Sequence, residues 1–352
     1  MRHATALSIS VFLLFVFLCA GRTGMAQDAH FSQFSRTSAY ANPAFVGLSP
    51  APARLALQYR NQWPSVLAGQ SYHSALAAFD WRNCLGLSFF AFGVSAQASR
   101  AGDSRYTDGQ AMLSLAYHQQ IDQGFFLAGG VRGGAWNYRI DEGQLAFEEQ
   151  FDGIGFDSGR NNFESFDQLQ RTVFGLSAGL LLYDTEAAWQ IGASLLHINQ
   201  PLYSFLEDAQ NGNRVGMGWS MQGQFGISTN RSPDSKELAL QFFYRQQALF
   251  KNSKQRMLSV GGLWQLIENN KGNAFFLGLY GRVGRHEGDS SFTFDSVTPY
   301  MRIDFGDWSF GLSYDVNVSP LANVSRLNGA VELSVQANIG DIRDCIRCPS
   351  NW

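Results

Sequence analysis

Two segments near the C-terminal end show the clearest pattern of hydrophobic and polar positions. Within residues 310–318 and 327–339, apolar side chains alternate with polar or small ones. Successive side chains of a strand point to opposite faces, so both segments are predicted to be strands with one apolar and one polar face. Asp315 and Glu332 fall midway along the polar faces, which therefore do not enclose a dry core. The apolar faces must contact lipid or a second sheet.

The same alternation recurs through the chain and predicts fourteen strands, most of them near the length of about 9–11 residues that a tilted strand needs to cross a bilayer. The composition agrees, because 36 Gly, 29 Phe, 12 Tyr and 8 Trp accompany only 9 Pro. The predicted strands are 53–60, 71–80, 84–93, 111–121, 124–137, 173–183, 187–196, 217–229, 236–245, 257–265, 273–283, 297–305, 308–317 and 327–339.

The connections between the predicted strands indicate what the apolar faces contact. Short connections at 81–83, 122–123, 184–186, 230–235, 266–272 and 306–307 alternate with long ones at 61–70, 94–110, 138–172, 197–216, 246–256, 284–296 and 318–326. This alternation is typical of an up-and-down barrel in an outer membrane, with short periplasmic turns on one rim and long outer loops on the other. We therefore predict an all-β, antiparallel transmembrane β-barrel that closes on itself and leaves no backbone group unpaired in hydrocarbon.

The polar faces of the strands then line the lumen of the barrel. Their mixed charges favour an interior that is internally ion-paired and partly plugged over a pathway for ions of one sign. The charged residues predicted to line the lumen are Arg54, Arg60, Arg302, Asp304, Asp315 and Glu332.

The two ends of the chain are predicted to lie outside the barrel strands. A secretory signal peptide is predicted at the N-terminus, because an apolar run ends in small residues at the two positions that signal peptidase reads, Gly24 and Ala26. Lipoprotein processing at Cys19 is disfavoured, because the residues before it are bulky. After the signal peptide come a segment that either packs in the lumen or lies at the periplasmic rim, the barrel, and a periplasmic tail. The bounds of the four regions are 1–26, 27–52, 53–339 and 340–352.

Motifs that carry catalysis, phosphate binding or metal binding are absent from the sequence, so we predict no catalytic residue, no cofactor and no metal. The acidic loop 138–172 lacks EF-hand spacing, and its five Phe residues are expected to fold onto the loop, plug the barrel or contact a partner. Cys345 and Cys348 have no second cysteine pair, so a disulfide or free thiols are favoured over a zinc or redox site. Because 26 Lys and Arg stand against 29 Asp and Glu, no nucleic-acid partner is expected.

Several motifs are similar, in the same order along the chain, to those of one known family. They are Gln27-Asp-Ala-His-Phe-Ser-Gln-Phe34 followed by Asn42-Pro-Ala-Phe-Val-Gly47, Tyr59-Arg-Asn-Gln-Trp-Pro64, His197-Ile-Asn-Gln-Pro-Leu-Tyr-Ser-Phe205, and Ser313-Tyr-Asp-Val-Asn-Val-Ser-Pro-Leu321 with Gly329-Ala-Val-Glu-Leu-Ser334. On these motifs the chain resembles the PorP/SprF family, outer-membrane proteins of the type IX secretion system.

The resemblance implies a non-enzymatic protein in the outer membrane of a Gram-negative, Bacteroidota-type bacterium, with a role in protein secretion and gliding motility. Its implied partners are type IX secretion subunits and the C-terminal signal domain of a secreted or surface-anchored adhesin, besides outer-membrane lipid. The alternative is a porin or transporter for small solutes, because fourteen strands can enclose a lumen. The residues expected to bind partners, all in or near long loops, are Asn61, Trp63, Pro64, His197, Asn199, Pro201, Phe205, Asn317 and Ser319.

Overall fold

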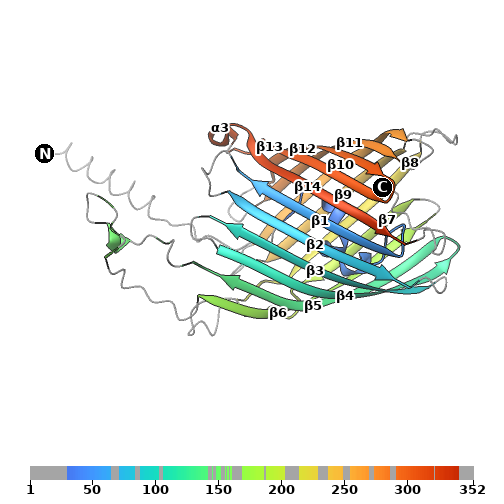
Figure 1. Ribbon diagram of the computed structural model, residues 1–352, viewed down its shortest axis with the longest axis horizontal. Helices are drawn as coiled ribbons and strands as arrows, with labels where there is room; N and C mark the ends of the chain where they lie inside the picture. The colour runs from blue at the N-terminus through green and yellow to red at the C-terminus, as the bar shows by residue number, and fades with distance from the viewer. Residues whose placement is uncertain are drawn as a thin grey trace.

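The alternating segments form a closed antiparallel barrel (Figure 1). The computed structural model describes residues 30–64, 71–83, 88–102, 106–141, 169–185, 188–202, 214–228, 237–248, 254–268, 273–285, 291–320 and 322–340, with short stretches at 145, 148–151, 155, 157 and 159–160. Within these residues, fourteen strands follow one another around the barrel in chain order. The first strand closes the sheet by pairing with the last, so that Ala53 lies opposite Ile339. The predicted fold class is confirmed.

The strands are β1 (Ala53–Gln62), β2 (Tyr72–Arg82), β3 (Phe89–Ala101), β4 (Tyr106–Asp122), β5 (Phe125–Arg139), β6 (Gln170–Asp184), β7 (Trp189–Leu196), β8 (Gly218–Ser228), β9 (Glu237–Ala248), β10 (Lys254–Glu268), β11 (Ala274–Arg285), β12 (Thr293–Phe305), β13 (Trp308–Asn317) and β14 (Asn328–Ile339). Short helical turns are η1 (Phe34–Thr37), α2 (Ser38–Ala41), η2 (Pro43–Phe45), η4 (Glu148–Gln150) and α3 (Ala322–Ser325). No described helix is long and apolar enough to cross a membrane.

The outer surface of the barrel is apolar, and the inner surface is largely polar, with apolar clusters where Phe34 and Phe45 pack against it. Along β13, Phe310 and Leu312 are exposed, whereas Ser313 and Asp315 are buried inside. This is the burial expected when one face of each strand contacts hydrocarbon and the other faces a filled lumen.

Several strand ends differ from the prediction. The strand predicted at 84–93 runs from Phe89 to Ala101, and β4 begins at Tyr106, so residues 102–105 replace the long loop predicted at 94–110. The extra strand residues are mostly small or polar. They extend the sheet by backbone pairing without the apolar alternation that revealed the membrane-spanning part.

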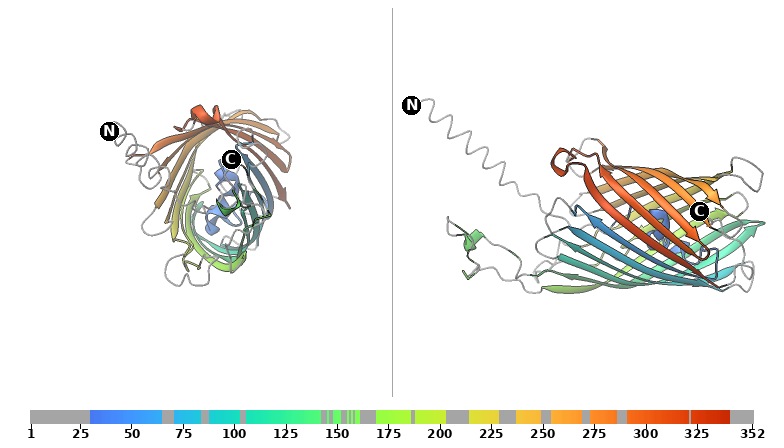
Figure 2. Two further views of the ribbon diagram at one scale, coloured as in Figure 1. Left: turned by 90° about the vertical axis from the view of Figure 1, so that its left-hand side faces the viewer. Right: turned by 45° about the horizontal axis from the view of Figure 1, so that its top comes forward.

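Residues 30–52, called the plug below, fold inside the barrel. Figure 2 shows this segment, in blue, within the ring of strands when the barrel is viewed from one end. Phe34 stacks on Phe243 at a ring-centroid distance of 5.5 Å and contacts the edge of Tyr280 at 5.7 Å. Of the two positions left open by the sequence, the plug thus takes the lumen, with its last residues leading into β1 at the short-turn rim.

Candidate functional site

The plug is attached to the barrel wall at Asn42. This side chain is completely buried and donates hydrogen bonds of 3.1 Å to the carbonyl oxygens of Leu180 and Ala193. Its amide oxygen accepts a hydrogen bond from the N–H of Ala44, which starts the η2 turn. One asparagine therefore caps a turn of the plug and binds it to β6 and β7.

Glycines in the wall leave room for the plug. A Cβ atom added to Gly130 would lie 2.5 Å from the backbone nitrogen of Ala44, and one added to Gly179 would collide with the plug as well. By contrast, a Cβ atom on the neighbouring Gly129 would meet only Leu180, at 3.8 Å, among the nearest atoms. The inward glycines are thus required by the close approach of the plug backbone.

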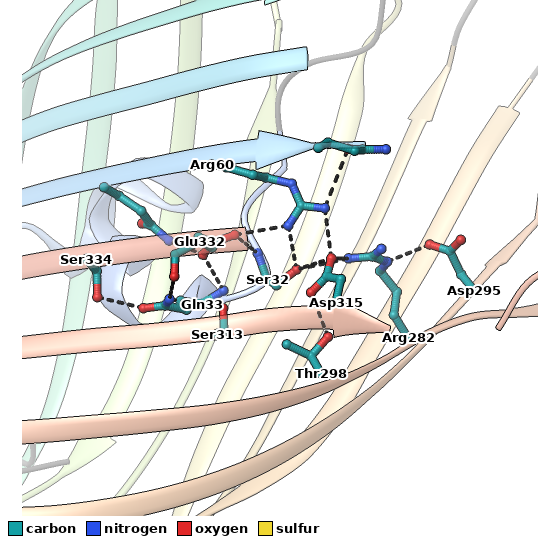
Figure 3. Close-up of polar contacts among 12 residues, drawn as sticks. Ser32, Gln33, Arg60, Arg282, Asp295, Thr298, Ser313, Asp315, Glu332 and Ser334 are labelled. Carbon is teal, nitrogen blue, oxygen red and sulfur yellow. Dashed lines mark hydrogen bonds and ion pairs between the residues drawn. The ribbon is translucent and has the colours of Figure 1, made fainter. Parts of the chain in front are cut away.

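A buried charged network, made of Ser32, Arg60, Arg282, Asp315 and Glu332, joins the plug to the barrel (Figure 3). Arg60 of β1 forms ion pairs with Asp315 at 2.8 Å and with Glu332 at 3.1 Å. Arg282 of β11 forms a second ion pair with Asp315, at 3.1 Å. The network therefore connects the barrel seam between β1 and β14 to strands β11 and β13.

The plug completes this network with its backbone. Glu332 accepts hydrogen bonds of 2.8 Å from the N–H groups of both Ser32 and Gln33. The hydroxyl of Ser32 donates to Asp315 at 2.8 Å and accepts from Arg60 at 2.8 Å. Because the plug hydrogen-bonds both carboxylates of this buried ion-paired network, these contacts hold it against β13 and β14.

A second group of charges lies nearer the short-turn rim. Arg54 pairs with Asp80 at 3.0 Å, and Asp80 also accepts the N–H of Gly47 in the plug at 2.9 Å. Arg302 donates from Nε to Asp304 at 2.9 Å and from Nη2 at 2.5 Å. The six residues predicted to line the lumen all lie on inward faces, divided between this group and the charged network.

The sequence did not reveal every member of these groups. Arg282 and Asp80 were missed, although each shares the inward parity of its strand, and that parity was the available signal. Ser32 and Gln33 lie in the motif at 27–34 but were not predicted to join the network. Their backbone N–H groups, which bind Glu332, carry no sequence mark, and the contact of the Ser32 hydroxyl with Asp315 depends on the folded barrel.

On the outer rim, Trp63 lies beside the loop that joins β13 and β14. Its backbone has φ 58° and donates to the carbonyl of Gly329 at 2.7 Å, while its ring lies 5.5 Å from that of Tyr72. Asn61 is half-buried at the end of β1, and Pro64 is exposed. These contacts hold the chain as it leaves β1 against the start of β14.

Asn317 and Ser319 shape the β13–β14 loop. The Asn317 side chain is buried, donates to the hydroxyl of Ser325 at 3.0 Å and accepts the N–H of Ser319 at 3.0 Å. Gly329, at the start of β14, is the residue whose carbonyl accepts the backbone hydrogen bond from Trp63. The structure therefore brings two of the three predicted outer-rim groups together, at the barrel seam.

The third group lies elsewhere around the barrel, at the end of β7. His197 is buried, has φ 54° and stacks on Trp136 at 4.6 Å. Asn199 accepts the N–H of Leu176 at 3.0 Å and donates to the carbonyl of Phe174 at 2.6 Å. Pro201, two residues on, is buried, and Phe205 lies outside the described residues.

Among the described residues, β7 ends here while β6 continues beyond it. All of β6 pairs with β5, but only residues 178–184 of β6 pair with β7. In an antiparallel strand alternate residues direct their N–H and C=O groups to opposite sides. Since Leu176 points toward Asn199, Thr172 and Gln170 point the same way, and no strand of the described part pairs with them there. We call residues 170–174 the β6 edge.

Among the residues that the structure describes, no three His, Cys, Asp or Glu side chains lie together in a way that would hold a metal ion. Most of the acidic loop 138–172, its Phe residues, and the cysteines at 84, 345 and 348 lie outside the described residues.

Comparison with protein families decides the relationship that the motifs indicated. A family model described as "Type IX secretion system membrane protein PorP/SprF" matches residues 23–337. The chain belongs to the PorP/SprF family. A transmembrane β-barrel of this secretion-system family is an outer-membrane protein, so the predicted location is confirmed. No curated protein matches the chain.

Solved structures similar to this PorP/SprF chain are also barrels. "CymD monoaromatic hydrocarbon channel" is 13% identical, with 91% of this chain and 95% of that chain covered and a TM-score of 0.47. "TodX monoaromatic hydrocarbon channel deltaS2 mutant" is 10% identical, with 86% and 94% covered and a TM-score of 0.49. BamA from Haemophilus ducreyi is 9% identical, with 82% and 70% covered and a TM-score of 0.44.

The motifs on which the chain resembles the PorP/SprF family carry the contacts described above. Asn42 anchors the plug, Arg60 and Asp315 hold the charged network, and Asn199 ends the pairing of β6 with β7. Four motifs that lie far apart in the sequence thus build two features, a plugged lumen and a strand β6 that extends past the described end of β7.

Proposed function

We propose that this PorP/SprF protein is a non-enzymatic component of the type IX secretion system that binds apparatus subunits, the C-terminal signal domain of a secreted or surface-anchored adhesin, or both. The plugged lumen carries the proposal. The charged side chains of the barrel interior are engaged with each other and with the plug, so the interior acts as a scaffold and the rims remain for partners.

The outer rim supplies the proposed contact for a secreted partner. Beyond Phe174, whose carbonyl is bound by Asn199, the N–H and C=O groups of Gln170 and Thr172 in the β6 edge point to a side where no described strand pairs with them. Such an edge can accept an extended segment as an additional strand. The seam, where Trp63 lies beside the loop that Asn317 shapes, is a separate place for a second subunit. In this proposal residues 1–26 are removed as a signal peptide and residues 340–352 are periplasmic.

A porin or transporter for small solutes is the second candidate, favoured only by the closed barrel itself. The plug opposes it, because a solute would have to displace a segment fixed by buried hydrogen bonds to Asp315 and Glu332 and by Asn42. Opening the lumen would break several such contacts at once.

Affinity purification from the native outer membrane tests the leading proposal. The wild-type protein should recover type IX secretion subunits or one large adhesin. A variant with Trp63→Ala and Asn317→Ala, and a second with Asn199→Ala and Thr172→Pro, should each lose a different partner. The matched control is Asn323→Ala in the same outer loop, which exposes its side chain and makes none of the contacts described. Recovery of neither kind of partner by wild type would overturn the proposal.

A further inference from the structure

A polar cavity of about 390 Å³ lies between the plug and the short-turn rim. The plug contributes Arg36 and Leu48 to its lining, and the strands contribute Gln190, Gln224 and Gln336 near their short-turn ends. On the topology described above, this rim faces the periplasm. The cavity is therefore a concave, largely polar surface open to periplasmic molecules.

Three arginines and two carboxylates, those of Asp304 and Glu268, line the cavity. Glu268 accepts a hydrogen bond from Gln265, and the partners of the three arginines differ. Arg54 is paired with Asp80, and Arg302 is paired with Asp304. Arg36 is only 6% exposed, yet in the described part of the chain its guanidinium donates only to the carbonyl of Ser309, at 3.2 Å. Its Nε is buried with no partner there. A buried cation without a carboxylate is unfavourable, so this position favours an incoming anion.

The cavity also holds an unused acceptor. The Oε1 atom of Gln190 is buried and accepts no hydrogen bond from any described residue. A ligand that satisfies both groups must offer an anionic oxygen to Arg36 and a hydrogen-bond donor to Gln190. An acidic residue within a polypeptide provides the two at separate positions, through its side-chain carboxylate and its backbone amide, whereas inorganic phosphate would have to supply both from a single small ion.

We propose that this cavity binds a carboxylate-bearing segment of a periplasmic polypeptide, with the carboxylate on Arg36. The biological source of that segment, a periplasmic part of the secretion apparatus, rests on the function proposed above. Binding itself does not, because it is measured with the purified barrel alone.

The test uses two synthetic peptides, acetyl-Gly-Ser-Glu-Ser-Gly-amide and the same peptide with Gln in place of Glu. Binding to the purified barrel in detergent is measured by titration calorimetry. The Glu peptide should bind more tightly than the Gln peptide, and Arg36→Gln should weaken its binding by at least about tenfold, as expected for the loss of a charge-assisted hydrogen bond. Arg36→Lys, which retains the charge, should weaken binding less.

The matched control is Arg256→Gln. Arg256 is a wall arginine on the outer half of β10 that donates to Gln246 and does not line the cavity. Its variant should bind the Glu peptide as wild type does. Equal binding of the two peptides, unchanged binding by a correctly folded Arg36→Gln variant, or phosphate binding as tight as that of the Glu peptide would overturn the proposal. Affinity purification could still succeed in each of these cases, so the two proposals fail separately.

Discussion

At the scale of single residues, Asp315 and Glu332 lie within two membrane-crossing strands, yet both are almost fully buried. Two arginines and the backbone of the plug supply the partners that make this burial tolerable. The carboxylates therefore need the plug, and the plug is held by the carboxylates. This mutual requirement explains how a short segment with little regular secondary structure stays in place.

Glu332→Ala should destabilise the protein by about 3–5 kcal/mol, because it removes one acceptor of Arg60 and leaves the N–H groups of Ser32 and Gln33 without their partner. Urea unfolding of the barrel in lipid vesicles, followed by tryptophan fluorescence, measures the change. Glu268→Ala is the control, because this residue lies at the rim and bonds only to Gln265 among the described residues. Equal stabilities of the two variants would contradict the role of the network.

At the scale of elements, β6 and β7 differ in length, and the sequence explains this difference only once the structure is known. β6 runs from Gln170 to Asp184, while β7 has paired residues only from Trp189 to Leu196. The left-handed backbone at His197 turns the chain. Beyond it, the side-chain amide of Asn199 makes the hydrogen bonds to β6 that the backbone of a longer β7 would make. The segment that contains His197 and Asn199 therefore ends the pairing of β7 with β6 as well as turning the chain.

Proline substitutions distinguish the two sides of β6. Thr172→Pro removes an N–H that points toward the unpaired side, so stability should change by less than about 1 kcal/mol. Val173→Pro removes an N–H that points toward Trp136 of β5, and should cost about 3 kcal/mol or more. Urea unfolding of both variants checks this, and a reversed order would mean that the β6 edge is not where the register places it.

Most strands could be predicted because membrane crossing imposes a strict apolar alternation. Where strands extend beyond the hydrocarbon, as in residues 94–101 of β3, backbone pairing continues without that constraint and the sequence gives no warning. The plug was harder to predict, because its short helical turns have no periodicity and its position depends on contacts with distant strands. Asp315 indicated a polar interior, but it did not indicate that the hydroxyl of Ser32 would bind there.

At the scale of the whole molecule, both proposals depend on which rim of the barrel faces the cell surface. The short turn between β12 and β13 contains Asp307, and the opposite rim contains α3. With the cysteines at 84, 345 and 348 replaced by Ser, a cysteine introduced by Asn323→Cys should react with a membrane-impermeant maleimide on intact cells. One introduced by Asp307→Cys should react only after the outer membrane is permeabilised. The opposite pattern would reverse the orientation and place the polar cavity at the cell surface.

The plug fills the barrel because residues of the charged network bind it and inward glycines of the wall leave room for it. If the lumen serves as a scaffold, small solutes should not pass it. Gly130→Val should displace the plug, because its added side chain would meet Ala44, whereas Gly129→Val on the lipid side should leave the plug in place.

Conductance in planar bilayers tests this most directly. Purified wild-type protein and Gly129→Val should show no steady conductance, and Gly130→Val should show an increase above that baseline. Steady conductance through the wild-type barrel, at the level of an open porin, would contradict the account and favour the solute-transport alternative.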